Sequence, residues 1–329
     1  MTSRNLCFLC ISSICMGLIS CAGEKTDRII VSAPFGPLSY PLVYMEKYNE
    51  QSSFAESMEL VIWKNPDQLR AMIAGNQADF FALPTNVAAL FHNKGMSCKL
   101  INVSVWSVLW LVSGDSTKVH LRDFKYQEIV IPFKGDMPHI IFENICKKQG
   151  LNPEKDFKLR FVNTPMDAAQ QLLIGNADHA VLAEPDISIL IYRTKTEKSE
   201  SAKRFYRAVD FQEEWNKIYG TGVKIPIGGI AVPEKVSVNS ELIEKFQKEY
   251  AQAVYWCQNH PDETGKLIAD YFEGVPSEPI IDAIDHVDQT FVKTKDAISS
   301  LEMFFSVLLE GNPASIGGKM PENDFYLEE

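Results

Sequence analysis

The sequence lacks the features that usually mark a nucleic-acid-binding or membrane-spanning protein. Its 329 residues include 43 acidic and 32 basic side chains, giving a formal net charge of −11, and no basic run could follow a phosphate backbone. After residue 21 no apolar segment approaches the length of about 20 residues that a bilayer span requires. The composition, with 46% hydrophobic residues, is that of an acidic globular protein, and we expect no nucleic-acid partner.

Cysteine and histidine are also too sparse to build a metal centre. Four of the seven cysteines lie within the first 21 residues, and the other three show no CxxC spacing and cannot all pair. Two lone histidines, His139 and His179, have no partners at metal-ligand spacing. The sequence therefore predicts no disulfide framework, no metal site and no cofactor. The three cysteines concerned are Cys98, Cys146 and Cys257.

The N-terminus has the layout of a secretory signal. A single charge, Arg4, precedes the apolar run "LCFLCISSICMGLIS" and then the small residues around Cys21. The stretch "LISC" at 18–21 resembles a bacterial lipobox, in which the cysteine is lipidated. We expect residues 1–20 to be a signal peptide and Cys21 to anchor an exported protein at the bacterial cell membrane, facing the periplasm or exterior. An ordinary cleavable signal or an N-terminal anchor helix is the alternative.

One theme occurs twice, about a domain length apart. The stretches "LRAMIAGNQADFFALP" (69–84) and "AQQLLIGNADHAVLAEP" (169–185) both join a helix end to Gly-Asn, an acidic residue, an apolar run and a proline. We expect Gly75 and Gly175 to end helices, and Asp79 and Asp178 to be turn residues. Extended upstream and downstream, both copies read as β-α-β-α-β-α. The expected strands are 28–34, 58–64, 79–84, 126–133, 157–164 and 179–185, and the expected helices are 40–50, 66–75, 85–95, 138–150, 165–175 and 186–195.

This alternation predicts an α/β fold with mainly parallel sheets in two lobes. The segments 108–114 and 221–232 flank the second copy, so we expect them to connect the lobes. Lobe one should then comprise 21–115 plus 221–329, and lobe two 116–220. From residue 240 onward the apolar spacing is helical, which predicts a C-terminal helical layer packed on lobe one.

In open parallel sheets, ligands bind at the carboxyl ends of strands, against the N-termini of the following helices. Two such edges facing one another would form a cleft between the lobes. The residues that we expect to bind a ligand there are Phe35, Pro37, Leu38, Ser39, Tyr40, Pro84, Thr85, Asn86, Trp106, Lys134, Gly135, Asp136, Met137, Glu184 and Asp186.

The order of several motifs resembles a known family. "KGDMPH" (134–139), the second copy of the theme, "GGIAVPE" (228–234) and the helix at 240–263 are similar to ABC-transporter substrate-binding lipoproteins of the nitrate/sulfonate/taurine and thiamine-precursor (pyrimidine) group. The resemblance implies a type II periplasmic-binding-protein fold: two lobes, two hinge crossings and a cleft that closes on a small molecule. It also implies a monomer that works with the permease and ATPase subunits of an importer.

One residue departs from that group and bears on the ligand. The family often has a hydroxyl where this chain has Asp136, and a carboxylate beside a bound anion is costly unless Lys134 neutralises it. Together Asp136 and Glu184 suit a ligand with amino or ring N–H donors, such as an aminopyrimidine, held between aromatic side chains. Asp136 could instead be only the N-cap of the helix at 138–150, and Trp106 and Trp110 could be core residues.

An enzyme is the competing class, because the same fold also hosts biosynthetic enzymes acting on pyrimidine-like or organic-acid substrates. The chain shows no nucleophile-elbow pattern and no cysteine-rich site in the expected mature part, so we expect no catalytic residues. The effector domain of a transcription regulator would need an N-terminal helix-turn-helix, where this chain carries the signal-like segment.

Overall fold

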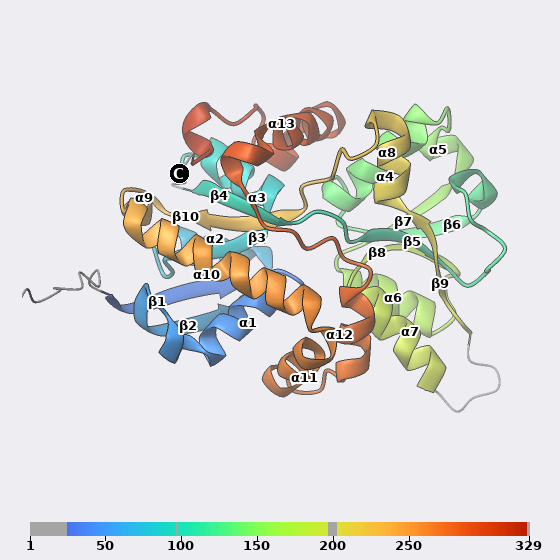
Figure 1. Ribbon diagram of the computed structural model, residues 1–329. Coiled ribbons are helices and arrows are strands. Elements are labelled where there is room, and N and C mark those ends of the chain that lie inside the picture. Colours follow the sequence, from blue (N-terminus) through green and yellow to red (C-terminus); the bar gives the residue numbers. More distant parts are fainter. Residues whose placement is uncertain (1–24, 97, 197–202, 328–329) are drawn as a thin grey trace, which may run out of the picture.

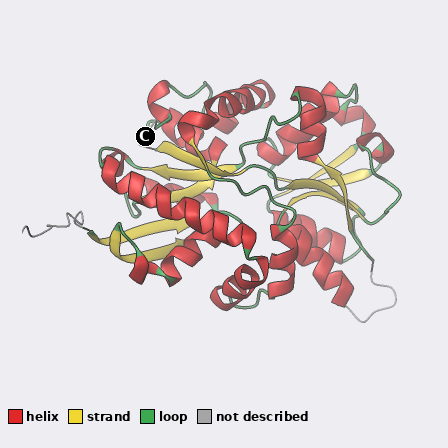
Figure 2. Cartoon of the chain, in the orientation of Figure 1, coloured by secondary structure: helices red, strands yellow, loops and turns green. Residues whose placement is uncertain are grey.

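The computed structural model describes residues 25–96, 98–196 and 203–327 as two α/β lobes side by side, each built on one sheet (Figures 1 and 2). The signal peptide expected at 1–20 and the lipidated Cys21 lie outside the described residues. Within the described part of the chain, no helix combines the length and apolar character that crossing a membrane requires.

The first sheet contains the strands of the first repeat unit at one end. The first strand of this unit lies between its other two strands and pairs parallel with both. In the pairing with the second strand, Val31 lies opposite Leu60. A later strand then pairs antiparallel with the third strand. The order is β11 (Val292–Lys293), β4 (Lys99–Val105), β10 (Gly228–Val232), β3 (Phe80–Pro84), β1 (Thr26–Ala33) and β2 (Ala55–Ile62).

The second sheet repeats this plan. Its order is β7 (Lys158–Val162), β6 (Glu128–Pro132), β8 (His179–Ala183), β5 (Leu109–Ser113) and β9 (Tyr206–Asp210). The order β7-β6-β8 matches β2-β1-β3, and β5 lies antiparallel beside β8 as β10 lies beside β3. The predicted α/β fold with two similar lobes is confirmed, but both sheets are mixed and not mainly parallel, because β10, β4 and β11 in the first and β5 and β9 in the second pair antiparallel.

The helices of the two units follow their strands as predicted. Asn65 caps α2 by accepting from the Gln68 N–H, and Thr164 forms a capping box with Asp167 at the start of α6, each ahead of a proline at the first helical position. The six helices are α1 (Tyr40–Lys47), α2 (Pro66–Ala74), α3 (Thr85–Asn93), α4 (Met137–Lys148), α6 (Pro165–Leu173) and α7 (Asp186–Thr196).

The repeated glycines end their helices in slightly different ways. Gly75 is the C-cap of α2 with φ −87°, and Asn76 takes the left-handed conformation. In the second copy Ile174 is the C-cap and Gly175 itself is left-handed, so the expectation for Gly175 is off by one residue. Asp79 accepts from the Ile30 N–H, as befits a turn residue at the start of a strand.

The remaining helices cover the lobes. In lobe two they are α5 (Pro153–Asp156) and α8 (Phe211–Tyr219), and toward the C-terminus α9 (Glu234–Ser237), α10 (Ser240–Asn259), α11 (Pro261–Tyr271), α12 (Ser277–Ile284) and α13 (Thr294–Gly311). α10 packs on α1 of lobe one, as expected of the C-terminal layer. In contrast, α12 contacts α7 of lobe two, and α13 contacts α4 of lobe two. The C-terminal layer therefore bridges the lobes.

The expected connection at 108–114 is wrong. Residues 109–113 form β5, which pairs with β8 on one side and β9 on the other. The apolar run around Trp110 is buried because it lies between two strands of the second sheet, and its position just before the second repeat gave no sign of that pairing. Likewise, residues 228–232 of the other expected connection form β10 of the first sheet. The lobe boundaries stay a prediction, with the first crossing moved to 106–108 and the second to 220–227.

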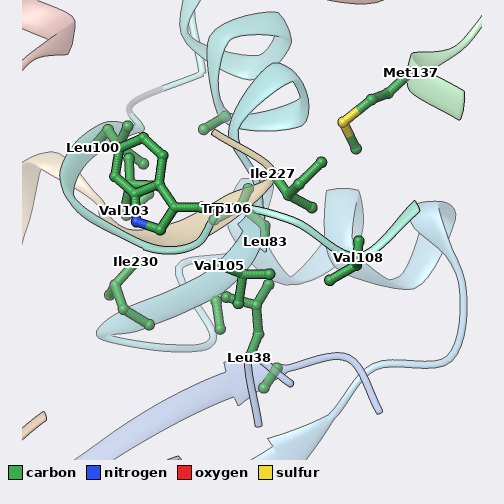
Figure 3. Packing of buried hydrophobic residues seen from close by; sticks show 14 of the residues in the cluster. Leu38, Leu83, Leu100, Val103, Val105, Trp106, Val108, Met137, Ile227 and Ile230 are labelled. Carbon is green, nitrogen blue, oxygen red and sulfur yellow. The ribbon is translucent and has the colours of Figure 1, made fainter. Parts of the chain in front are cut away.

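Apolar residues of both crossing segments are continuous with the core. Trp106, Val108 and Ile227 are buried, and Met137 at the start of α4 extends toward them (Figure 3).

Within the described residues the three cysteines are buried free thiols, and burial raises the pKa of both Cys98 and Cys257 to about 12. They therefore act as small core residues at neutral pH.

Candidate functional site

A cavity of about 290 Å³ lies between the lobes, at the carboxyl ends of their strands. Lobe one contributes the starts of α2 and α3, lobe two contributes the starts of α4 and α6 and the end of β8, and the two crossing segments supply Val108 and Ile227. The lining residues are Trp63, Lys64, Asn65, Pro66, Leu69, Pro84, Asn86, Val87, Val108, Leu109, Pro132, Phe133, Asp136, Met137, Pro138, Pro165, Val181, Leu182, Ala183 and Ile227.

The wall is mainly apolar. Trp63 and Phe133 are its aromatic members, one from each lobe. Lys64 and Asn65 are exposed, which places their side chains at the rim, so the polar groups in the buried part are Asn86 and Asp136. An apolar cavity with two convergent polar groups is a common form of small-molecule site.

Asp136 joins the two lobes inside this cavity. It is the N-cap of α4 and its Oδ1 accepts from the Met137 N–H at 2.7 Å and from Asn86 Nδ2 of lobe one at 2.8 Å. Burial raises the pKa of Asp136, while these two hydrogen bonds oppose the rise. The helix-cap interpretation is therefore correct, and the same carboxylate also lies on the cavity wall.

Asn86 is the lobe-one partner and is 2% exposed. Its Nδ2 also approaches the carbonyl oxygen of Ser315 at 3.5 Å. Among the described residues its Oδ1 has no hydrogen-bond partner. The N-cap of α3 is Pro84, which supplies no side-chain cap to the first turn where Asn86 lies. Asn86 Oδ1 is thus a buried acceptor that the described residues leave unsatisfied, and it has almost no accessible surface.

The loop at 133–137 has two left-handed residues, Phe133 at φ 56° and Gly135 at φ 78°. The Gly135 N–H donates to His139 Nδ1 at 3.1 Å, and its carbonyl accepts from Asn312 Nδ2 at 2.6 Å. Lys134 places its ammonium 5.2 Å from the centre of the Phe161 ring. Because neither Lys134 nor Gly135 lines the cavity, Lys134 is not in position to neutralise an anion bound there.

The predicted residues at 35–40 are engaged in contacts within the protein, and all but the half-buried Phe35 are buried. Ser39 donates to the Gly36 carbonyl, Gln289 donates to the Pro37 carbonyl, and Phe35 packs edge-on against Phe272. Two further predicted residues of this loop, Leu38 and Tyr40, are buried as well, and the Tyr40 hydroxyl has no partner among the described residues. None of the five lines the cavity.

Thr85 and Trp106 also have structural contacts. Thr85 Oγ1 donates to the Pro226 carbonyl at 2.5 Å, tying α3 to the second crossing. Trp106 Nε1 donates to the Thr290 carbonyl at 2.8 Å and its ring is 3% exposed, which supports the core interpretation. Trp110 packs edge-on against His286, outside the cavity lining.

Glu184 belongs to an ionic cluster that connects β8, β9 and α12. Its Oε1 accepts from Arg207 Nε at 2.7 Å and its Oε2 accepts from Ser188 Oγ at 2.8 Å, while Arg207 Nη2 reaches Asp282 Oδ2 at 2.7 Å. Burial raises the pKa of Glu184, against the attraction of Arg207. Both carboxylate oxygens are occupied and Glu184 is absent from the cavity lining, so we do not retain it as a ligand acceptor.

Asp186, next to this cluster at the start of α7, has its pKa raised to about 6 by burial and by the charge of Glu184. It does not line the cavity.

Of the predicted site residues, four line the inter-lobe cavity: Pro84, Asn86, Asp136 and Met137. Sequence reasoning missed Trp63, although it lies at the end of an expected strand, and the crossing residues Val108 and Ile227, which carried no local signal.

No protein-family model and no curated protein matches this sequence. Solved structures do. An ABC transporter protein from Parabacteroides distasonis is similar at 19% identity and a TM-score of 0.74, over 93% of this chain and 100% of that one. The periplasmic aliphatic sulphonate binding protein SsuA from Escherichia coli is similar at 16% identity and a TM-score of 0.67, over 93% of both chains. The periplasmic nitrate-binding protein NrtA from Synechocystis is similar at 13% identity and a TM-score of 0.64, over 86% of this chain and 81% of that one.

These similarities establish the fold. The chain has the two-lobed architecture of periplasmic binding proteins from the nitrate and sulfonate group, which confirms the resemblance expected from the motifs at the level of fold. The described ranges contain no group of three or more His, Cys, Asp or Glu side chains arranged to hold a metal ion.

Proposed function

We propose that the chain is the extracytoplasmic solute-binding component of an ABC importer, which captures a small organic molecule by hinge closure and delivers it to the permease. The observation that carries this proposal is the inter-lobe cavity, enclosed by strand ends of both lobes and by the two crossings. A ligand held there would contact both lobes and stabilise their closed arrangement. The names of the similar structures, which include sulphonate- and nitrate-binding proteins, support this class.

The ligand that we propose is a small, planar, nitrogen-bearing solute, with an aminopyrimidine favoured over a sulfonate or nitrate. Trp63 and Phe133 offer aromatic surfaces to a ring. Asp136 offers a carboxylate acceptor, and an inorganic anion would bring a second negative charge close to it without a cation on the buried wall.

Membrane attachment is a separate part of the proposal. A lipidated Cys21 would hold the receptor beside its permease, because two or more acyl chains anchor a protein stably to a membrane surface. Mass spectrometry of the membrane-extracted protein should find an acylated N-terminus at Cys21. Equal membrane retention of the Cys21→Ala protein would contradict it.

A thermal-shift screen of the chain from residue 25 onward tests the binding function. A ligand present at 100 times its dissociation constant adds about 2.7 kcal/mol to the free energy of unfolding. The screen should include aminopyrimidines, sulfonates, nitrate and amino acids. We expect aminopyrimidines to raise the melting temperature and to be recovered unchanged. Conversion of a ligand to product would favour the alternative, a biosynthetic enzyme with this fold.

A cavity-filling variant locates the binding site. Val87 lines the cavity, so Val87→Trp should occupy the ligand's space and abolish the thermal shift. The matched control is Val238→Trp, since Val238 is 77% exposed and lies outside the cavity lining. A shift that survives in Val87→Trp would place the ligand elsewhere.

A further inference from the structure

The Asp136 carboxylate has one oxygen in use and one free. Its Oδ1 accepts from the Met137 N–H at 2.7 Å and from Asn86 Nδ2 at 2.8 Å. Its Oδ2 accepts from no described residue and, unlike Asn86 Oδ1, keeps accessible surface, since Asp136 is only half-buried. Asp136 lines the cavity, and so does Asn86, which its Oδ1 contacts from the opposite lobe. Oδ2 is therefore the carboxylate oxygen available to a bound molecule.

None of the described cations balances this carboxylate. At Glu184, on the packed side, the attraction of Arg207 lowers the pKa against the effect of burial. At Asp136 only two hydrogen bonds oppose the rise of the pKa on burial, and no positive side chain of the described residues takes part. Lys134 lies outside the cavity lining, and Lys64 is exposed at its rim. A negative charge on a mainly apolar wall thus lacks the counter-charge that a buried carboxylate needs.

The aromatic part of the wall also suits a positive charge. Trp63 and Phe133 line the cavity, one from each lobe. The Trp63 Nε1–H donates to the Ala82 carbonyl at 3.3 Å, so the indole is held in place with its only donor occupied. The ring therefore offers carbon surface to a ligand, and aromatic faces attract cations electrostatically. An anion would gain no donor from this ring and would meet the Asp136 carboxylate.

We propose that the cavity selects an organic cation, whose charged N–H group pairs with Asp136 Oδ2 while its apolar body lies against the wall. This inference rests on the proposed binding function and narrows it to nitrogen-bearing solutes that carry a positive charge, such as amidinium or protonated amine compounds. A hydrogen bond between ionised groups is roughly twice as strong as a neutral one. Charge thus discriminates between molecules of the same size and shape.

Three planar probes of nearly equal shape test the selection by charge. At neutral pH benzamidinium is positive, benzamide is uncharged and benzoate is negative. Each is titrated calorimetrically into the wild type. We expect benzamidinium to bind at least about tenfold more tightly than benzamide, and benzoate to bind more weakly than either.

The variant Asp136→Asn tests the residue that carries the selection. Asparagine is as good an N-cap as aspartate, so α4 should keep its start, and a circular dichroism melt verifies that the variant is folded. Without the charge, the preference for benzamidinium over benzamide should fall by about tenfold. The matched control is Asp67→Asn, which removes the same charge from an exposed side chain in the first turn of α2, next to the lining residue Pro66. This control should keep the wild-type preference.

Several outcomes would overturn the charge pairing while leaving solute binding intact. A wild type that binds benzamide or benzoate as tightly as benzamidinium is one. An unchanged preference in folded Asp136→Asn is another, and an equal loss of preference in Asp67→Asn is the third.

If none of the three probes binds, the compound with the largest shift in the wider screen is titrated instead. Binding that Asp136→Asn leaves unchanged overturns the charge pairing, whereas a cation whose binding weakens by about tenfold supports it. The absence of any shift in the screen would overturn the proposed function, and this inference with it.

Discussion

The two lobes meet at two related places, and these differ in what fills them. In one, the loop after β6 (133–137) faces the end of β3 and the start of α3 (84–87) across the cavity. In the other, the corresponding loop of lobe one (35–40) faces the corresponding junction of lobe two (184–186). There the two segments are in direct contact, since a Cβ atom added to Gly36 would lie 3.7 Å from Pro185 Cδ.

The difference shows what the repeat does and does not determine. The repeated β-α-β-α-β-α unit places three equivalent loops in each lobe at the carboxyl ends of the strands. Side chains then decide which pair encloses space. Around 184–186 a buried carboxylate is matched by Arg207 and surrounded by packed residues, whereas at 133–137 one carboxylate and one amide share a hollow, mainly apolar wall.

The largest effect should come from removing the cation on the packed side. Arg207→Met leaves Glu184 buried without its counter-charge, which typically costs about 3 to 5 kcal/mol of unfolding free energy. Urea denaturation checks this, with Arg204→Met as the control because Arg204 is exposed. An Arg207→Met protein as stable as the control would mean that the ionic cluster does not hold the packed contact together.

The variant Asp186→Asn should stabilise the same side, in a pH-dependent way. The folded pKa of about 6 lies above the ordinary value of 3.8, so the folded protein holds this proton more tightly than the unfolded chain. Stability is therefore lost as the pH rises from about 4 to 6, and the loss is complete above that range. At 1.36 kcal/mol per pKa unit, the variant should gain about 2 to 3 kcal/mol at pH 7.5.

That gain should shrink to well under 1 kcal/mol at pH 4, where Asp186 is protonated in the folded protein and about 40% protonated in the unfolded chain. Thermal melts of wild type and variant at the two pH values make the comparison. An equal gain at both would show that the effect comes from the shape of asparagine and that the Asp186 charge has no part in it.

The smallest effect belongs to the hollow side. Asp136→Ala removes the cap of α4, which typically costs about 1 kcal/mol, and it also relieves the burial of a carboxylate. We expect a loss of about 1 kcal/mol or less by urea denaturation. A loss as large as that of Arg207→Met would mean that Asp136 has a mainly structural role.

The sequence predicted the framework well because the framework depends on local signals. Prolines at helix starts, glycines at helix ends and the periodicity of the apolar residues mark each element of the two copies. The strand β5 was missed because its neighbours β8 and β9 come about 70 and 100 residues later in the chain. Its pairing is a property of the assembled sheet.

The site was predicted less completely for the same reason. The loop ends at 84–86 and 133–137 were correctly placed at strand ends, and Asn86 and Asp136 came from that argument. Nothing near Glu184 in the sequence indicates that Arg207 and Asp282 occupy its surroundings. Which strand-end loops enclose a cavity depends on contacts between residues that are distant in sequence.

Hydrogen exchange with and without a ligand found in the thermal-shift screen tests most directly whether solute binding occurs at the hollow contact. Ligand should slow exchange at 63–66 and 84–87 in lobe one and at 132–138 in lobe two, with little change at 35–40 and 184–186. Slower exchange in one lobe only, or mainly at 35–40 and 184–186, would contradict binding in the inter-lobe cavity.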